Sequence, residues 1–192
     1  MLDWLRRLDL NLLFALNHHH TPLWDWLMWQ FSGNLLWLPL YFFVLFVFIK
    51  SFHRQSIWII LLVILAIGLS DFTSVHLFKE TVKRLRPCHN PFLMGQIVLV
   101  HNHCGGLYGF FSSHASNTFT LATIASLLVR KKYFTAMMFL WAIIVSISRV
   151  YMGVHYPSDI MAGACWGMII GLVFYVLTKY LILNHNGKSE NR

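Results

Sequence analysis

The chain has 192 residues, of which 57% are hydrophobic, 16% aromatic and only 11% charged. So few charges cannot cover the surface of a water-soluble domain of this length, and the long apolar runs are typical of membrane spans, so the composition excludes an ordinary soluble globular protein. The formal net charge of +8 is expected from basic residues that flank membrane spans and meet anionic lipid headgroups, and not from nucleic-acid binding.

The predicted elements form one all-α domain, a polytopic transmembrane helical bundle of about five to six spans. Residues 1–22 are predicted to form a short amphipathic helix on the membrane surface, because leucines recur there at helical spacing between charged residues. Apolar runs predict spans over residues 24–49, 57–78, 114–130, 133–151 and 157–183. Residues 79–113 contain repeated Gly and Pro and are predicted to form a loop, and the polar tail 184–192 is expected to be frayed.

The distribution of Lys and Arg predicts which side of the membrane the loop faces. Once the basic residues of the cluster described next are set aside, more Lys and Arg lie on the side of residues 50–54, 130–132 and the C-terminal tail. That side is therefore expected to be cytoplasmic, and the loop 79–113 and the N-terminal helix are expected to face outward. The alternative is that the N-terminal segment crosses the membrane.

Three clusters of polar residues fall at span ends on the outward side, where they can converge on one pocket. Their members are Lys79, Arg86 and Pro87; Ser112, Ser113 and His114; and Ser148, Arg149, His155 and Asp159. The cations and the N–H groups at a helix start are the donors that a phosphomonoester requires. Asp159 lies four residues after His155, so it can orient that imidazole as a nucleophile, while His114 serves as general acid and then activates water. This scheme requires no metal or other cofactor.

These clusters resemble the motifs of the type-2 phosphatidic acid phosphatase superfamily, which are K-x6-RP, PSGH and SR-x5-H-x3-D. The first and third match in full, whereas Phe111 and Ser113 stand in place of proline and glycine in the second. The resemblance implies an all-α fold and a membrane lipid phosphatase that works through a phosphohistidine on His155, with Asp159 as its partner and His114 as acid. It implies phosphate contacts from Lys79, Arg86, Ser112, Ser113 and Arg149. The motifs cover residues 79–159.

The resemblance leaves several substrates open, because the family acts on undecaprenyl diphosphate, phosphatidylglycerol phosphate, phosphatidate and the phosphates of lipid A. The small size and outward basic site favour a bacterial envelope lipid, in an inner-membrane protein whose site faces the periplasm or exterior. One alternative is a phosphate-binding or lipid-transporting protein without turnover, although binding alone does not need two histidines and a carboxylate. The other is a vanadate-holding haloperoxidase, which the apolar spans disfavour. The sequence does not predict an oligomeric state.

Several further residues have competing interpretations. Asp71 lies inside the second predicted span, eight residues before Lys79, and is interpreted as a buried structural group with a partner in the bundle. Lys83 and Arg84 are expected to meet lipid headgroups. Cys88 and Cys104 could form a disulfide or, with nearby histidines, bind zinc, although the spacing fits no standard zinc site. His18, His19 and His20 are interpreted as a polar interfacial cluster. Gly163, Gly167 and Gly171 indicate a close helix contact, within the bundle or between subunits.

Overall fold

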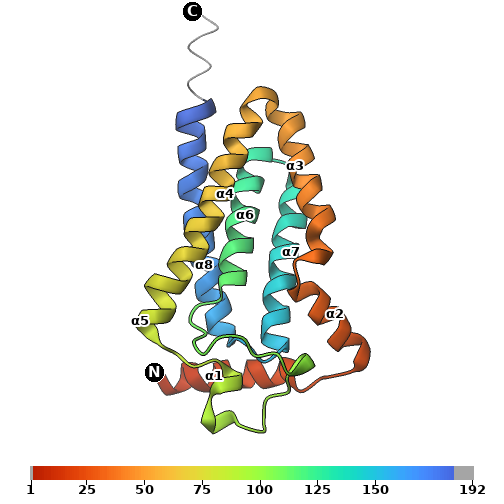
Figure 1. Cartoon of the computed structure of the whole chain (residues 1–192), viewed down its shortest axis with the longest axis vertical. Helices are drawn as coiled ribbons and strands as arrows, with labels where there is room; N and C mark the ends of the chain where they lie inside the picture. Colours follow the sequence, from red (N-terminus) through yellow and green to blue (C-terminus); the bar gives the residue numbers. More distant parts are fainter. Residues whose placement is uncertain (1, 184–192) are drawn as a thin grey trace, which may run out of the picture.

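The protein is a bundle of long helices with one helix lying across its end (Figure 1). We describe residues 2–183 from a computed structural model, so the tail at 184–192 lies outside the described residues. The long helices are α3 (Leu38–Phe52), α4 (Ser56–Thr73), α6 (Ser113–Val129), α7 (Lys132–Tyr151) and α8 (Pro157–Thr178). Helix α1 (Leu2–Asn17) crosses the end of the bundle at which α6 begins and α7 ends (Figure 1). The predicted all-α class is confirmed.

Three stretches of helix are long and apolar enough to cross a membrane, namely Leu35–Val82, Lys132–Tyr151 and Pro157–Leu183. The first stretch folds back on itself at the 3₁₀ turn His53–Gln55, which makes α3 and α4 antiparallel neighbours (Figure 1). Large apolar side chains are exposed along the outer helices, among them Phe42, Ile64 and Ile169. A helix exterior of this kind is stable in lipid and not in water, which is consistent with a membrane protein.

The span predicted over residues 24–49 is wrong as a single helix, because the chain breaks in its middle. Helix α2 (Pro22–Ser32) ends at Gly33, and a 3₁₀ turn (Leu35–Trp37) leads into α3. Gly33 and Asn34 are poor helix formers, and Pro39 in the first turn of α3 favours a new helix start there. The apolar residues on both sides conceal this break in the sequence.

The loop predicted over residues 79–113 begins four residues later than expected. Helix α4 continues through a π-helical turn (Ser74–Lys79) and a last short turn, α5 (Glu80–Val82), so Lys79 lies on a helix. The loop then makes 3₁₀ turns at Pro87–His89, Pro91–Leu93 and Val100–Asn102. A disulfide joins Cys88 to Cys104. Both thiols of the hypothetical zinc site are therefore used in that bond.

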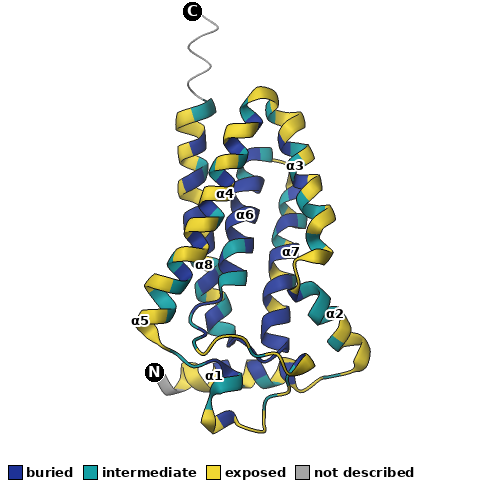
Figure 2. Ribbon diagram, viewed as in Figure 1, coloured by how far each residue is buried: buried dark blue, intermediate teal, exposed yellow. Residues whose placement is uncertain are grey.

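Helix α6 lies at the centre of the bundle and is the most deeply buried of the long helices (Figure 2). It is rich in Ala, Ser and Thr, whose small side chains allow close approach of its neighbours. Helix α8 packs on it through Gly163, Gly167 and Gly171: an added Cβ at each would lie 2.6, 2.2 and 2.7 Å from atoms of α6 or of Ser112, the residue that precedes it. The glycine stripe is therefore a contact within the bundle.

Candidate active site

The three sequence clusters meet at the end of the bundle that α1 crosses. Lys79 comes from the π-helical turn after α4, Arg86 from the loop, and Arg149 from the last turn of α7. His155 lies in the short connection to α8, where Pro157 begins the helix and Asp159 occupies its first turn. Ser112 caps α6, so Ser113 and His114 open that helix. The spacing of each motif thus follows from which helix end carries it.

His155 is held between a guanidinium and a carboxylate, and only 1% of it is exposed. Its Nδ1 lies 3.5 Å from Asp159 Oδ2, and its Nε2 lies 3.1 Å from Arg86 Nη1. Because Arg86 can only donate, Nε2 must accept, which places the ring proton on Nδ1 facing the carboxylate. Burial, followed by the positive charges of Arg86, Arg149 and Lys79, holds the pKa of His155 well below its usual value. The arrangement favours a neutral imidazole with a lone pair on Nε2.

Asp159 is fully buried and makes contacts that the sequence motifs do not predict. Its Oδ2 accepts from the backbone N–H of Tyr156 at 3.0 Å, and its Oδ1 accepts from Arg84 Nη1 at 2.9 Å. Arg84 also donates to Ser158 at 2.6 Å and to Asp9 of α1 at 2.5 Å. The expectation that Arg84 meets lipid headgroups is therefore wrong: its guanidinium pairs with two buried carboxylates.

Asp9 completes this network from the surface helix. It is buried, and besides Arg84 it accepts from the backbone N–H of Ser158 at 2.8 Å and from the Ser158 hydroxyl at 2.6 Å. The guanidinium of Arg84 also lies 3.9 Å from the centre of the Tyr156 ring. The rarity of acidic residues in this chain, seven in all, is the signal that could have drawn attention to Asp9 and its need for a partner.

The remaining cations are partly paired with hydroxyl groups. Lys79 Nζ donates to Ser113 Oγ at 2.6 Å, and Ser113 Oγ lies 2.5 Å from Ser74 Oγ. A glycine, which the family motif has in place of Ser113, could not make these contacts. Arg149 is 7% exposed and donates to Ser32 at the end of α2, while its Nε has no hydrogen-bond partner among the described residues.

Ser112 serves its own helix. Its hydroxyl is fully buried and faces the N–H of Ala115 at 3.5 Å, as an N-cap does, and its N–H donates to the Asp159 carbonyl at 3.1 Å. The neighbouring motif departure, Phe111, is 2% exposed and packs with its ring centre 4.6 Å from that of Phe78. These contacts fix the start of α6 against the start of α8 and against the π-helical turn after α4.

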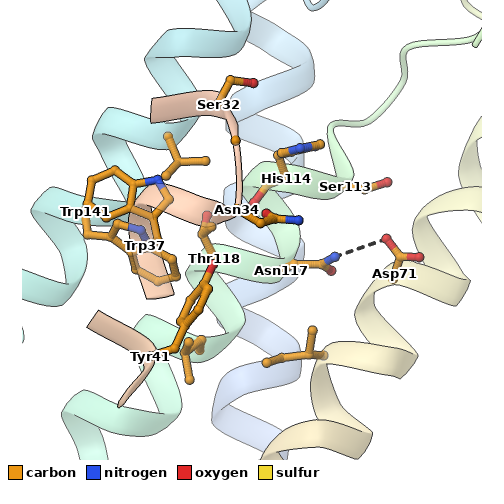
Figure 3. Close-up of a pocket in the computed structure, with 14 residues that line it drawn as sticks. Ser32, Asn34, Trp37, Tyr41, Asp71, Ser113, His114, Asn117, Thr118 and Trp141 are labelled. Atoms are coloured by element: carbon orange, nitrogen blue, oxygen red, sulfur yellow. Dashed lines mark hydrogen bonds between the residues drawn. The ribbon is translucent and has the colours of Figure 1, made fainter. Parts of the chain in front are cut away.

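A cavity of about 570 Å³ opens beside His114, between α3, α4, α6 and α7 (Figure 3). A smaller cavity of about 320 Å³ shares His114, Ser32 and Asn34 with it and reaches Arg149. His155 and Asp159 line neither cavity, because both are buried. Of the residues predicted to form one pocket, Ser113, His114 and Arg149 line these two cavities, whereas Lys79, Arg86 and Ser112 line neither.

The contacts of Asp71 and of the histidine cluster decide how these residues are interpreted. Asp71 is exposed rather than buried, and Asn117 donates to it at 3.1 Å, so the expected bundle-side partner is present on α6. In the histidine cluster, His18 contacts the Gln96 carbonyl at 3.0 Å and His20 pairs with Asp25 at 2.6 Å. The cluster therefore ties α1 to α2 and to the loop, as a polar cluster does.

Comparison with known proteins identifies the family of this chain. Residues 57–183 match the PAP2 superfamily. The chain is 35% identical to a lipid A 4'-phosphatase of Bacteroides thetaiotaomicron, over 94% of this chain and 81% of that protein. It is 31% identical to a lipid A 4'-phosphatase of Porphyromonas gingivalis, over 93% of this chain and 76% of that protein.

Solved structures have the same fold. The crystal structure of a transmembrane PAP2-type phosphatidylglycerolphosphate phosphatase from Bacillus subtilis superimposes with a TM-score of 0.71 at 22% identity, covering 92% of this chain and 87% of that one. That of Aquifex aeolicus LpxE gives 0.62 at 26% identity, covering 87% of this chain and 94% of that one. The sequence match, the shared fold and the helical membrane architecture place this chain in the PAP2 superfamily, as a membrane phosphatase.

Proposed function

We propose that the protein removes a phosphate from lipid A, at the outward face of a bacterial inner membrane, through a phosphohistidine on His155. The observation that carries the mechanism is the placement of His155, whose Nε2 faces Arg86 while its Nδ1 faces Asp159. A neutral imidazole held in one tautomer beside fixed cations is suited to attack a phosphorus atom. Two relatives that match more than nine-tenths of this chain, both lipid A 4'-phosphatases, support the substrate.

The reaction has two displacements in this proposal. First, His155 Nε2 bonds to phosphorus as the bond to the lipid oxygen breaks, and protonated His114 gives its proton to that oxygen. Lys79, Arg86 and Arg149 stabilise the equatorial phosphate oxygens. Then His114 takes a proton from water, the hydroxide oxygen bonds to phosphorus, and the P–N bond breaks to release inorganic phosphate and free His155. The phosphate approaches through the cavity end that His114 and Arg149 line.

The outward orientation has support from two independent features. The loop beside Arg86 carries the Cys88–Cys104 disulfide, and disulfides persist in oxidising compartments. Once the site cations Lys79, Arg86 and Arg149 are set aside, more of the described Lys and Arg residues lie at the opposite end of the bundle, where they are expected on the cytoplasmic side. Phe92→Cys on the loop and Tyr133→Cys at the other end, both strongly exposed positions, test this directly. A membrane-impermeant maleimide should label only the first in intact spheroplasts; labelling of the second alone would reverse the orientation.

The activity test is phosphate release from lipid A by detergent-purified protein with EDTA present. Wild type should turn over and form an acid-labile, base-stable phosphoprotein, and His155→Ala should do neither. His76→Ala, at an exposed histidine outside both cavities, is the matched control and should keep wild-type activity. Turnover by His155→Ala at the wild-type rate would refute the mechanism. Phosphate binding without turnover by wild type would support the non-catalytic alternative.

A further inference from the structure

Asp71 is the one charged residue of α4, and it faces the larger cavity (Figure 3). An ionisable side chain in a span is costly, so it is retained where it has a partner and a use. Asn117 donates to its Oδ1 at 3.1 Å, which turns the amide oxygen of Asn117 away. That oxygen is buried and accepts no hydrogen bond from any described residue. The exposed Asp71 carboxylate is therefore the acceptor that this pair presents to the cavity, and Asn117 holds it in position.

The pair lies one helical turn beyond the proposed phosphate contacts. Asn117 follows Ser113 by four residues on α6, and Asp71 of α4 precedes Ser74 of the π-helical turn by three residues. The Ser74 and Ser113 hydroxyls are 2.5 Å apart, and Ser113 accepts from Lys79. One helical turn advances about 5.4 Å, close to the width of a sugar ring or a glycerol unit. The two helices thus carry matching rows of polar residues at successive depths.

The next row is apolar. Ile67 lies four residues before Asp71, and Leu121 lies four residues after Asn117; both line the cavity. Trp141 and Val145 of α7 continue the same apolar wall. From the end of the bundle inward, the cavity therefore passes from Ser113, which accepts from Lys79, and His114 to the Asp71 carboxylate and then to hydrocarbon. A phosphorylated sugar or glycerol that carries acyl chains has its groups in the same order.

We infer that Asp71, held in position by Asn117, forms a subsite that accepts hydrogen bonds from hydroxyl or amide groups between the phosphate and the acyl chains of the substrate. This inference rests on the proposed function, which places the phosphate at Lys79. The subsite selects acylated sugar or glycerol phosphates over prenyl diphosphates. In a prenyl diphosphate the second phosphate follows the terminal one directly, so an anion without a hydrogen-bond donor would face the Asp71 carboxylate, and the two negative charges repel.

The test compares kcat/KM for lipid A and for undecaprenyl diphosphate in one detergent with EDTA. Asp71→Leu should lower the value for lipid A by about 10- to 100-fold, as expected for a lost hydrogen bond to a charged acceptor. It should leave the value for undecaprenyl diphosphate unchanged or raise it, and Asn117→Leu should shift the ratio in the same direction. Glu80→Gln removes an exposed carboxylate next to Lys79 that lies outside the cavity, and it should leave the ratio unchanged.

A binding measurement separates this inference from the proposed mechanism, because it requires no turnover. In a His155→Ala background, adding Asp71→Leu should weaken lipid A binding by a similar factor. If a variant fails to fold, Asp71→Asn, which keeps the size of the side chain, should shift both readouts in the same direction. An equal loss on both substrates, or unchanged lipid A binding in the double variant, would overturn the subsite. Loss of all turnover in His155→Ala alone concerns only the phosphatase mechanism.

Discussion

Replacing Arg84 with Gln should lower both kcat and the stability of the enzyme, although Arg84 lines neither cavity beside His114. Its guanidinium joins two carboxylates, Asp159 with a fully buried side chain and Asp9 with a side chain 8% exposed. Without it, Asp159 Oδ1 loses its only hydrogen bond from a described side chain, and Oδ2 keeps the N–H of Tyr156. The carboxylate that faces His155 is then free to turn.

The expected size of the effect follows from burial. Breaking a buried ion pair by removing one partner costs about 3–5 kcal/mol. The Arg84 side chain is 30% exposed, so water partly replaces it, and we expect a loss near the lower end, about 3 kcal/mol of unfolding free energy. Misplacing a group of the reacting set by about 1 Å costs on the order of 100-fold in rate. We therefore expect kcat to fall about 100-fold with KM little changed, because Arg84 does not contact the substrate.

The assay is steady-state phosphate release, with thermal unfolding in the same detergent. Lys83→Gln is the control, since it removes the same charge from an exposed neighbour. Arg84→Lys should rescue only in part, because one ammonium group cannot bind two carboxylates in the fork geometry of a guanidinium. If Arg84→Gln matched Lys83→Gln in kcat and stability, or raised KM at unchanged kcat, the positioning role would be refuted.

Three further outcomes are expected. Gly167→Ala should lower the melting temperature, at about 1–3 kcal/mol for an overpacked helix contact, whereas Gly68→Ala, with open space around it, should not. Replacing both disulfide cysteines, 16 residues apart, should cost about 3 kcal/mol and lower activity by loosening the Arg86 loop, while Cys165→Ser does neither. Burial and nearby cations hold the pKa of His155 below its usual value of 6.5, so the unfolded chain binds a proton at this residue before the folded protein does as the pH falls. The wild type should therefore lose stability below about pH 6.5 more steeply than His155→Gln, as measured by thermal unfolding across pH.

The sequence was sufficient for the helices whose boundaries carry strong local signals. Pro157 marks the start of α8, and the basic residues at 130–132 separate α6 from α7, so these boundaries were predicted to within a few residues. The break after Ser32 was missed because Gly33 and Asn34 are only two residues within a long apolar run. The end of helix α2 is therefore known only from the structure.

The candidate site also has features that the sequence predicts and features that it does not. Motif spacing predicts which residues come together at one end of the bundle, because each motif is anchored to a helix end. It does not predict the partner of Arg84, since Asp9 lies 75 residues away and contact between them depends on how α1 crosses the bundle. The exposure of Asp71 was also missed, because helical periodicity gives a direction around the axis and not the shape of the space that the side chain faces.

The contact between the surface helix and the motif-bearing ends bears on how modular this enzyme is. The family match begins at residue 57, yet Asp9 binds Arg84, Asn17 binds the carbonyl groups of Val98 and Tyr151, and Ser32 binds Arg149. A chimera that joined residues 57–183 to a foreign N-terminal segment would keep every family motif and lose all of these supports. The N-terminal helices and the motif-bearing region should therefore be inherited and engineered as one unit. A substitution on one side of residue 57 should be accompanied by a compensating substitution at its contact on the other side.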